Sequence, residues 1–255
     1  MTRPDPSGSL RWVGHATVLV ELDGVRLLTD PLLRTRVLHL RRAAPLDLGG
    51  LDALDAILVS HVHYDHLDPP SLRLLSQETA VVAPRGAAGL LGRIGFRSVA
   101  ELAAGDEIQV GNVGVRAVPA KHAASRVLGA RAESLGYVIE GSQRVYFPGD
   151  TDLFPEMAGL ATALDVALVP ISGWGPRVGP GHLDPRRAAE ALALLRPRIA
   201  VPIHWGTYYP LTSPGLARPE RLAAPAEEFV RAAAELAPAV DVRVLGVGER
   251  LPLLA

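Results

Sequence analysis

Residues 60–68, SHVHYDHLD, place three histidines and an aspartate within six positions, directly behind the apolar run LDAILV. Neutral imidazole and carboxylate groups together suit zinc, iron or manganese. In a short extended stretch, His61 and His63 can point the same way while Asp65 and His66 face a second ion. The alternative is a polar loop of solvated histidines, but unrelated histidines rarely cluster at ligand spacing behind a buried strand. The stretch therefore predicts a metal centre at the end of a strand.

Strand-like runs alternate with helical patterns along the whole chain. The strand-like runs, rich in Val, Ile and Leu, lie at residues 16–22, 25–29, 53–60, 80–83, 113–119, 135–140, 144–147, 165–170, 199–203 and 240–245. The helical patterns lie at residues 70–76, 86–94, 155–163, 185–195 and 220–236. This alternation predicts an α/β protein with helix-covered sheets, and turn signals at residues 21–25 and 140–143 indicate antiparallel hairpins and thus mixed sheets. Because no low-complexity linker divides the chain, we expect residues 1–255 to form one domain.

The composition is that of a globular chain without a strong global charge. The 255 residues are 48% hydrophobic, enough for a substantial core, and the formal net charge is -1. This balance does not favour nucleic-acid binding, and no apolar run approaches the roughly 20 residues that span a bilayer. The start of the chain lacks the apolar core of a secretory signal, so we expect a cytoplasmic protein. The absence of cysteine excludes disulfides, thiolate ligands and a cysteine nucleophile.

Further histidines and carboxylates follow other strand-like runs. Each of the following lies just beyond a separate run: Asp30, His122, Asp150 and His204. Residues at the same end of several strands converge on one crevice, which is where α/β folds bind their ligands. The sequence therefore predicts that these side chains join the histidines of residues 60–68 in a single pocket.

With these residues in this order, the chain resembles the metallo-β-lactamase fold superfamily over most of its length. Residues 61–66 are similar to the signature loop of that superfamily. The resemblance implies a four-layer αββα sandwich of two mixed sheets, with a dinuclear metal site at one edge between the sheets. It also implies the ligands, namely His61, His63 and His122 for the first metal, Asp65, His66 and His204 for the second, and Asp150 as the bridge.

Two bound cations would favour hydrolysis. A hydroxide shared by two cations is a nucleophile at neutral pH, and the same cations stabilise a developing oxyanion. Asp65 is the expected catalytic residue that accepts a proton from this water or orients it. Asp30 is expected to orient the ligand loop as a hydrogen-bond acceptor, with an ordinary turn aspartate before Pro31 as the alternative. Zn2+ is the favoured metal, and Mn2+ and Fe2+ are alternatives.

Flanking motifs indicate a branch of the superfamily. The chain is similar to the branch that contains N-acyl phosphatidylethanolamine phospholipase D, and L-ascorbate 6-phosphate lactonase is a more distant relative. The similar segments lie at residues 12–21, 28–31, 149–151, 182–185 and 203–207. Both enzymes act on substrates that carry phosphate. The resemblance places His182 near the substrate, where it would assist binding or protonate a leaving group; a helix-entry histidine without a role is the alternative. His15 is expected to line the pocket or to serve a structural role.

Two further segments could border the pocket. The insert of residues 32–48 mixes leucines with Arg34, Arg36, Arg41 and Arg42. It could supply an apolar wall and an arginine clamp for phosphate, or it could be a solvated basic face. Trp174 lies in a loop rich in glycine and proline, residues 171–177, where it would pack a substrate or seal the loop.

We therefore expect a metal-dependent hydrolase of a small-molecule ester, foremost a phosphodiester or another phosphate-bearing compound. Hydrolysis of a lactone or amide by the same site is one alternative, and a non-catalytic metal-binding protein of the same fold is another. A β-lactamase is not expected, because several antibiotic-hydrolysing members use a cysteine ligand near the position of Asp150 and this chain has none. A nuclease is not expected either, because nuclease action would normally require a strongly basic face. Whether copies of the chain associate into a homo-oligomer stays open.

Overall fold

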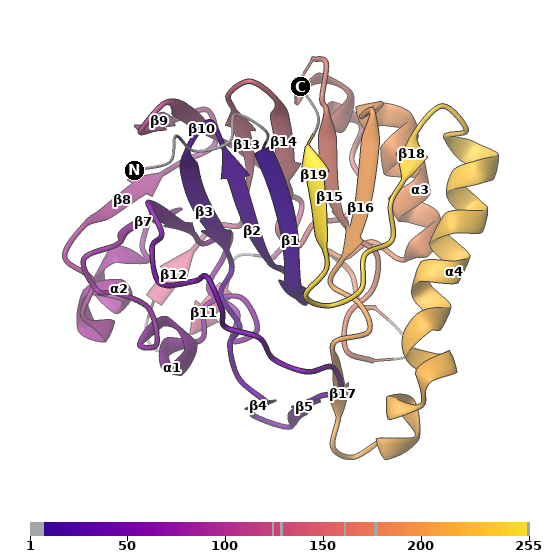
Figure 1. Ribbon diagram of the computed structural model, residues 1–255, viewed down its shortest axis with the longest axis horizontal. Coiled ribbons are helices and arrows are strands. Elements are labelled where there is room, and N and C mark those ends of the chain that lie inside the picture. Colours follow the sequence, from indigo (N-terminus) through magenta and orange to yellow (C-terminus); the bar gives the residue numbers. More distant parts are fainter. Residues whose placement is uncertain (1–7, 124, 128–129, 161, 176–177, 254–255) are drawn as a thin grey trace.

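Two seven-stranded sheets stacked face to face form the centre of the molecule (Figure 1). The computed structural model describes residues 8–123, 125–127, 130–160, 162–175 and 178–253, so the chain start used for the secretory-signal expectation lies outside the described residues. In spatial order, the first sheet contains β19 (Arg250–Leu253), β1 (Gly8–Gly14), β2 (Thr17–Leu22), β3 (Val25–Thr29), β6 (Ala56–Leu58), β7 (Ala80–Pro84) and β8 (Val99–Leu102). The second contains β18 (Asp241–Val242), β16 (Ile199–Ile203), β15 (Val166–Pro170), β14 (Arg144–Phe147), β13 (Leu135–Glu140), β10 (Val113–Pro119) and β9 (Glu107–Val110).

Helices and two smaller sheets surround this pair. The α-helices are α1 (Pro69–Leu72), α2 (Ala88–Ile94), α3 (Pro185–Leu195) and α4 (Pro219–Leu236), and the 3-10 helices are η1 (Pro155–Gly159) and η2 (Pro214–Ala217). One small sheet joins β17 (Tyr208–Pro210), β5 (Leu40–Arg42) and β4 (Arg36–Val37), and the other pairs β11 (Ser125–Val127) with β12 (Ala130–Ala132). The three-stranded sheet brings the insert of residues 32–48 against the segment that follows β16.

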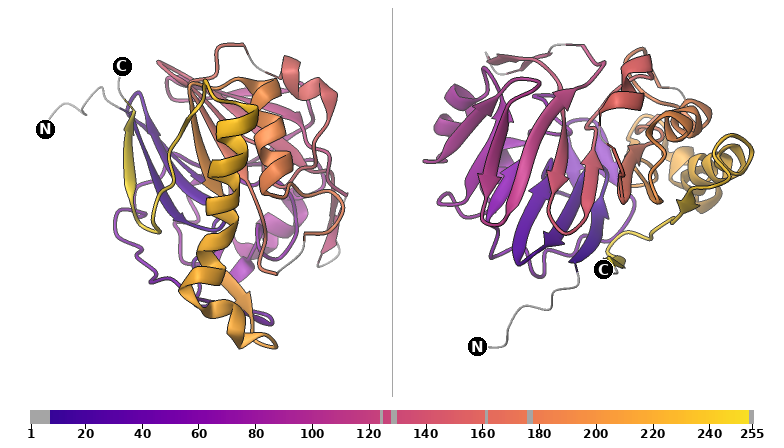
Figure 2. Two further views of the ribbon diagram at one scale, coloured as in Figure 1. Left: turned by 90° about the vertical axis from the view of Figure 1, so that its right-hand side faces the viewer. Right: turned by 90° about the horizontal axis from the view of Figure 1, so that it is seen from above.

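Three hydrophobic layers pack between the two large sheets and the helices on their outer faces, which together form four layers. Because side chains alternate along a strand, Leu10 and Trp12 of β1 face the second sheet, whereas Val13 packs on the opposite face with the side chains of α1 and α2. Leu192 of α3 and Phe229 of α4 pack on the outer face of the second sheet. Figure 2 shows the same order of layers from the side and from above. The four-layer αββα sandwich of mixed sheets is therefore confirmed.

Local chemistry sets the bounds of the best-predicted elements. The predicted helix at residues 185–195 is α3, which has Pro185 in its first turn and Asp184 as its N-cap, accepting a hydrogen bond from the Arg187 N–H at 2.8 Å. It ends at Arg196, whose left-handed φ of 49° stops the helix. Both predicted hairpins are confirmed as the antiparallel pairs β2 with β3 and β13 with β14.

Four predicted elements were clearly too long, the first of them the helix predicted at residues 70–76, which is α1 and ends at Leu72. The helix predicted at residues 155–163 is the short 3-10 helix η1, which ends at Gly159, a residue that weakens a helix because it loses the most backbone entropy. The strands predicted at residues 53–60 and 240–245 shrink to β6 and β18. An apolar run continues past the residues that pair with a neighbouring strand, so hydrophobic pattern alone overestimates the length of the strand.

The carboxyl ends of parallel strands from both sheets meet at one edge of the sandwich. β3, β6 and β7 are parallel in the first sheet, and β14, β15 and β16 are parallel in the second. The residues directly behind these ends and behind β10 are those singled out in the sequence: Asp30, His61, His122, Asp150 and His204. The fold thus brings five separated segments to one place.

None of the helices within the described residues has both the length and the apolar character needed to cross a bilayer.

We expect Phe229→Ala to destabilise the sandwich by about 3–5 kcal/mol, because it opens a cavity in the layer between α4 and the second sheet. Chemical denaturation measures this loss as a lower midpoint. The neighbouring Val230 is 41% exposed, so Val230→Ala is the matched control and should change stability by no more than about 0.5 kcal/mol. Equal effects of the two substitutions would contradict the packing of this layer.

Candidate metal centre

Three histidines from two segments form a first cluster. The Nε2 atom of His61 lies 2.9 Å from Nδ1 of His63, and Nε2 of His122 lies 3.0 Å from the same atom. The three nitrogens could all reach one ion. These are the residues expected to hold the first metal, and the structure brings them together.

A second cluster lies beside the first. The Nε2 atoms of His66 and His204 are 3.2 Å apart, and each lies 3.7 Å from Oδ2 of Asp65. His15 adds its Nε2 atom at 3.0 Å from the same carboxylate oxygen. The structure therefore brings together the three residues expected to hold the second metal, with His15 as a fourth group that the sequence did not assign to it.

Asp150 lies between the two clusters. Its Oδ2 atom is 3.9 Å from Nε2 of His61 and 3.2 Å from Nε2 of His66, and its Oδ1 atom is 3.2 Å from Nε2 of His204. The side chain is buried, and among the described residues Oδ1 has no hydrogen-bond partner. A buried carboxylate oxygen in this condition is costly unless a cation or a water molecule satisfies it.

Backbone carbonyls orient two of the histidines. Nδ1 of His122 lies 2.7 Å from the Gly181 carbonyl, and Nδ1 of His204 lies 2.8 Å from the Ser172 carbonyl. Since a carbonyl accepts only, each Nδ1 carries the proton and donates, which leaves a lone pair on Nε2. Both Nε2 atoms are the ones that face the clusters, as in protein metal sites where the remote ring nitrogen is held by an acceptor.

Asp30 orients two more histidines, one from each cluster. Its Oδ2 atom accepts a hydrogen bond from Nδ1 of His66 at 2.6 Å and another from the Ser60 hydroxyl at 2.5 Å. The Ser60 oxygen in turn lies 2.9 Å from Nδ1 of His61 and accepts a hydrogen bond from it. The expected role of Asp30 in orienting the ligand loop therefore agrees with its hydrogen bonds, and Ser60 is a member of this network that the sequence reasoning missed.

The electrostatics of the centre favour bound cations. Burial and the nearby His66 lower the pKa of His61 well below its usual value, so its ring is neutral and can offer a lone pair. Burial opposes a charge on His66, but Asp150, Asp65 and Asp30 together raise its pKa well above the usual value. Because three carboxylates favour a proton on this buried imidazole, the centre without cations has an excess of negative charge. Divalent cations fit such a donor set, because they satisfy the facing lone pairs and the carboxylates at once.

Several site residues have unusual backbone conformations. Asp30, His15 and His204 have positive φ values of 32°, 55° and 61°, a region that residues other than glycine rarely occupy. Gly149, directly before Asp150, has φ +61°, and a Cβ atom there would collide with the Ser60 side chain. Backbone strain of this kind concentrates at functional sites, where surrounding contacts hold it in place.

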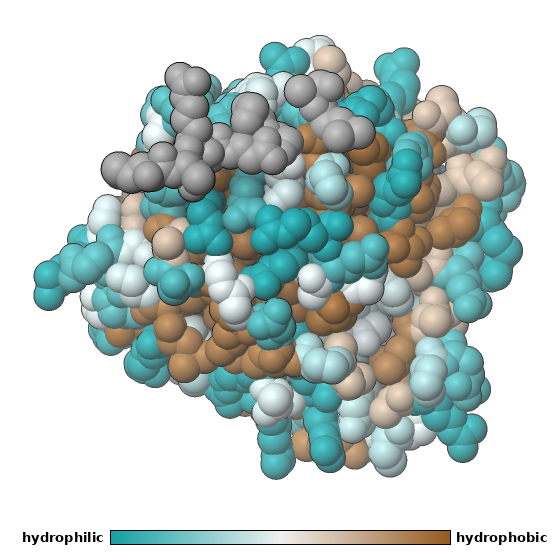
Figure 3. Space-filling view, in the orientation of Figure 1, coloured by the Kyte–Doolittle hydropathy of each residue, from teal (hydrophilic) through white to brown (hydrophobic). Residues whose placement is uncertain are grey.

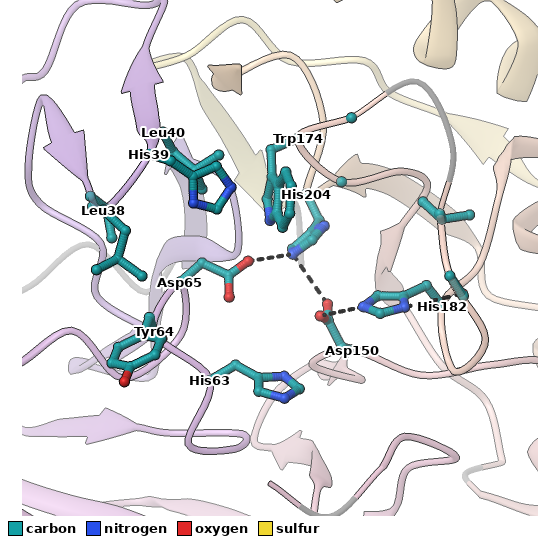
Figure 4. Close-up of a pocket in the computed structure, with 15 residues that line it drawn as sticks. Leu38, His39, Leu40, His63, Tyr64, Asp65, Asp150, Trp174, His182 and His204 are labelled. Atoms are coloured by element: carbon teal, nitrogen blue, oxygen red, sulfur yellow. Dashed lines mark hydrogen bonds and ion pairs between the residues drawn. The ribbon is translucent and has the colours of Figure 1, made fainter. Parts of the chain in front are cut away.

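A pocket of about 350 Å3 opens onto the clusters (Figure 4). Its polar lining comes from His63, Asp65, Asp150, His182 and His204, with His39 and Tyr64 farther along the wall. Its apolar lining comes from Val37, Leu38, Leu40, Trp174 and Val178. Figure 4 shows Trp174 beside His204 and His39, and the rings of Trp174 and His39 meet edge to face at 5.1 Å.

His182 reaches the centre from the loop before α3. Its Nε2 atom lies 3.3 Å from Oδ2 of Asp150, and its Nδ1 atom lies 3.2 Å from the Gly179 carbonyl. The hydrogen bond to Asp150 raises the pKa of His182, although partial burial opposes the charge. The side chain is 27% exposed and lines the pocket, and its expected place near a substrate stays a prediction.

The basic insert divides into an apolar hairpin and separate arginines. Residues 37–40 line the pocket, and Leu38 at the turn is 59% exposed. Arg42 is buried, donates to the Val13 carbonyl and lies over the Tyr208 ring, and Arg34 pairs with Asp68. The expected apolar wall is therefore present, whereas these two arginines are engaged by protein groups. Trp174 is 38% exposed on the same pocket, and the adjacent Pro176 and Arg177 lie outside the described residues.

All the histidines of the chain meet at this edge of the sandwich. They belong to the clusters or line the pocket: His15, His39, His61, His63, His66, His122, His182 and His204. His39 was not selected from the sequence, because a single histidine in a basic insert has no ligand spacing. Its place on the pocket depends on the pairing of β5 with β17, which the sequence pattern did not predict.

Comparison with known proteins gives a consistent picture. Residues 25–205 match the model of the beta-lactamase superfamily domain. A metal-dependent hydrolase of Caldivirga maquilingensis is 32% identical, over 96% of this chain and 98% of its own length.

Two further relatives differ in how fully they are covered. The N-acyl-phosphatidylethanolamine-hydrolyzing phospholipase D 1 of Caenorhabditis elegans is 33% identical over 77% of this chain, which spans 63% of that protein. The solved structure of a metallo hydrolase from Ignicoccus hospitalis superimposes with a TM-score of 0.71 at 26% identity, covering 98% of this chain and 99% of that one. The chain therefore belongs to the metallo-β-lactamase superfamily, among the members that are named metal-dependent hydrolases.

Proposed function

We propose that the protein is a dinuclear metal-dependent hydrolase of a small-molecule ester. The observation that carries the proposal is the convergence of two ligand clusters on Asp150 beside an open pocket. His61, His63 and His122 would hold one ion, Asp65, His66 and His204 would hold the other, and Asp150 would contact both. Donors that are imidazoles and carboxylates, in a chain without cysteine, support Zn2+ first, with Mn2+ and Fe2+ as alternatives.

The residues around the ions have separate chemical tasks. Divalent cations bound here would supply Lewis acidity and lower the pKa of a coordinated water. Asp65 would orient that water or accept its proton. Burial opposes a charge on Asp65, but the nearby His66 and His15 hold its pKa well below the usual value, so the side chain is an ionised acceptor. His182 would donate a proton to the leaving group from Nε2, because its contact with Asp150 favours the protonated ring.

A phosphodiester or another phosphate-bearing ester is the leading substrate class. The similarity to a phospholipase D that hydrolyses N-acyl-phosphatidylethanolamine supports this class, although the chain spans 63% of that relative. The bound cations, rather than an arginine clamp, would then neutralise the phosphate, since Arg34 and Arg42 are engaged elsewhere and no arginine is among the described residues that line the pocket.

A lactone or amide is the second substrate class, and the pocket lining supports it. Among the described lining residues none is a lysine or arginine, while Leu38, Leu40 and Trp174 offer apolar surface. An uncharged acyl substrate would bury that surface with no charge left unpaired. The same metal centre could serve either class, so the two differ in the binding group and not in the ligands.

Removing a ligand should abolish turnover while the fold persists. We expect His63→Ala and Asp150→Ala each to lower kcat/KM more than about 100-fold, beyond the 10–100-fold typical of groups that merely support a ligand. Metal content by elemental analysis should fall in both variants, with circular dichroism unchanged. Asp52→Ala, at an exposed position, is the control and should match the wild type. Activity that survives thorough chelation would exclude a metal-dependent reaction.

Asp30→Asn should weaken metal binding by about 10–100-fold, the range found for residues that orient ligands. The amide keeps the size of the side chain but has a single acceptor oxygen, so it cannot accept the Ser60 N–H on one atom and the Ser60 hydroxyl and His66 Nδ1–H on the other. Competition with a chromogenic chelator measures the affinity, and Asp52→Asn provides the exposed control. Wild-type affinity in Asp30→Asn would show that the Asp30 network does not orient the ligands.

A substrate panel separates the two classes. We expect kcat/KM for bis(p-nitrophenyl) phosphate and related diesters to exceed that for lactones by at least about tenfold, a difference of 1.4 kcal/mol in transition-state stabilisation. Metal content is measured on the same samples, so that a low rate is not confused with an empty site. The reverse order of rates would favour the acyl substrates and the apolar lining as the determinant of binding.

A further inference from the structure

His15 lies behind the second cluster and not on the pocket wall. It occupies the connection between β1 and β2, where the pairing of the two strands shifts register after Trp12. The side chain is buried, with 1% of the residue exposed, and the backbone has a positive φ of 55°. A strained, fully buried histidine needs surrounding contacts to hold it, and these contacts indicate its role.

The side chain of His15 contacts the second cluster. Its Nε2 atom lies 3.0 Å from Oδ2 of Asp65, and its ring lies 3.9 Å from the His204 ring and 5.6 Å from the His66 ring, between centroids. Because a carboxylate oxygen accepts only, Nε2 of His15 carries the proton and donates a hydrogen bond to Asp65. The three residues it contacts are those expected to hold the second ion.

The backbone of His15 is anchored independently of its ring. Its N–H donates to the Thr207 hydroxyl at 2.8 Å, and its carbonyl accepts from the His204 N–H at 2.9 Å and from the Trp12 indole at 2.9 Å. A substitution of the side chain leaves these bonds possible. The contribution of the ring to the site can therefore be separated from the contribution of the backbone to the fold.

We propose that His15 is a positioning residue for the second metal ion: its Nε2–H fixes the Asp65 carboxylate and leaves the first ion unaffected. This inference rests on the proposed dinuclear function. Without the donor, Asp65 would lose the hydrogen bond that selects one of its orientations, and the second ion would lose a preorganised ligand. His61 and His122 keep their own orienting partners, the Ser60 hydroxyl and the Gly181 carbonyl.

The test compares His15→Gln with His15→Met. The two side chains are similar in length and flexibility, and both remove the ring, but only Gln offers an N–H that can reach Asp65. Apoprotein is titrated with Zn2+ by calorimetry, and the bound metal is counted by elemental analysis after dialysis. We expect two ions per chain in the wild type and in His15→Gln, and a second ion bound about 10–100-fold more weakly in His15→Met, with the first ion unchanged.

Each other outcome is decisive. Two ions bound by His15→Met with wild-type affinity would overturn the positioning role. Equal weakening in both variants would also overturn it, because the ring and not the hydrogen bond would then matter. A wild-type protein that binds a single ion would contradict the dinuclear proposal itself, a result distinct from the first two. Circular dichroism and melting temperature confirm folding, and His39→Met, which removes a histidine from the pocket wall, should leave the metal count at two.

Discussion

The centre depends on the hydrogen bonds that the buried carboxylate of Asp30 accepts. This carboxylate accepts hydrogen bonds from the Ser60 N–H, the Ser60 hydroxyl and Nδ1 of His66, and through Ser60 it also orients His61. One side chain at the end of β3 thus fixes one histidine of each cluster. Burial raises the pKa of Asp30, while its hydrogen-bonded neighbours lower it, so the carboxylate depends on these partners to remain a charged acceptor. Because it is completely buried, its loss could not be compensated by solvent.

The sandwich makes this concentration of polar groups possible. Two sheets supply parallel strands that end at a common edge, so that short loops behind them reach the same space. The three hydrophobic layers beneath provide the rigidity that holds strained residues such as His15 and His204 at positive φ. The cost of burying several carboxylates and imidazoles together is offset when cations are bound, which links metal affinity to the stability of this edge.

The insert of residues 32–48 gives the pocket its particular character. Its hairpin pairs with β17, which follows His204, so the wall of the pocket and the candidate metal centre are built on connected segments. His39 at the turn contacts the ring of Trp174, which lies in the loop after β15, and Leu38 lines the same pocket. An apolar wall opposite a highly polar centre allows a substrate to be held by one end while the other end reacts. Arg42 fastens the hairpin by its bonds to the Val13 and Ala44 carbonyls.

The sequence by itself determined the class of the fold and indicated the histidines and aspartates that gather in the candidate centre. Spacing within residues 60–68 indicated metal ligands, and the hydrophobic periodicity located most of the strands behind which Asp30, His122, Asp150 and His204 lie, because these signals are local in the chain. Only the tertiary structure decided which acceptor holds each ring, that His15 faces Asp65, and that His39 borders the pocket. These contacts join residues tens to hundreds of positions apart, and they depend on strand register and on backbone carbonyls, which leave no mark in the order of side chains.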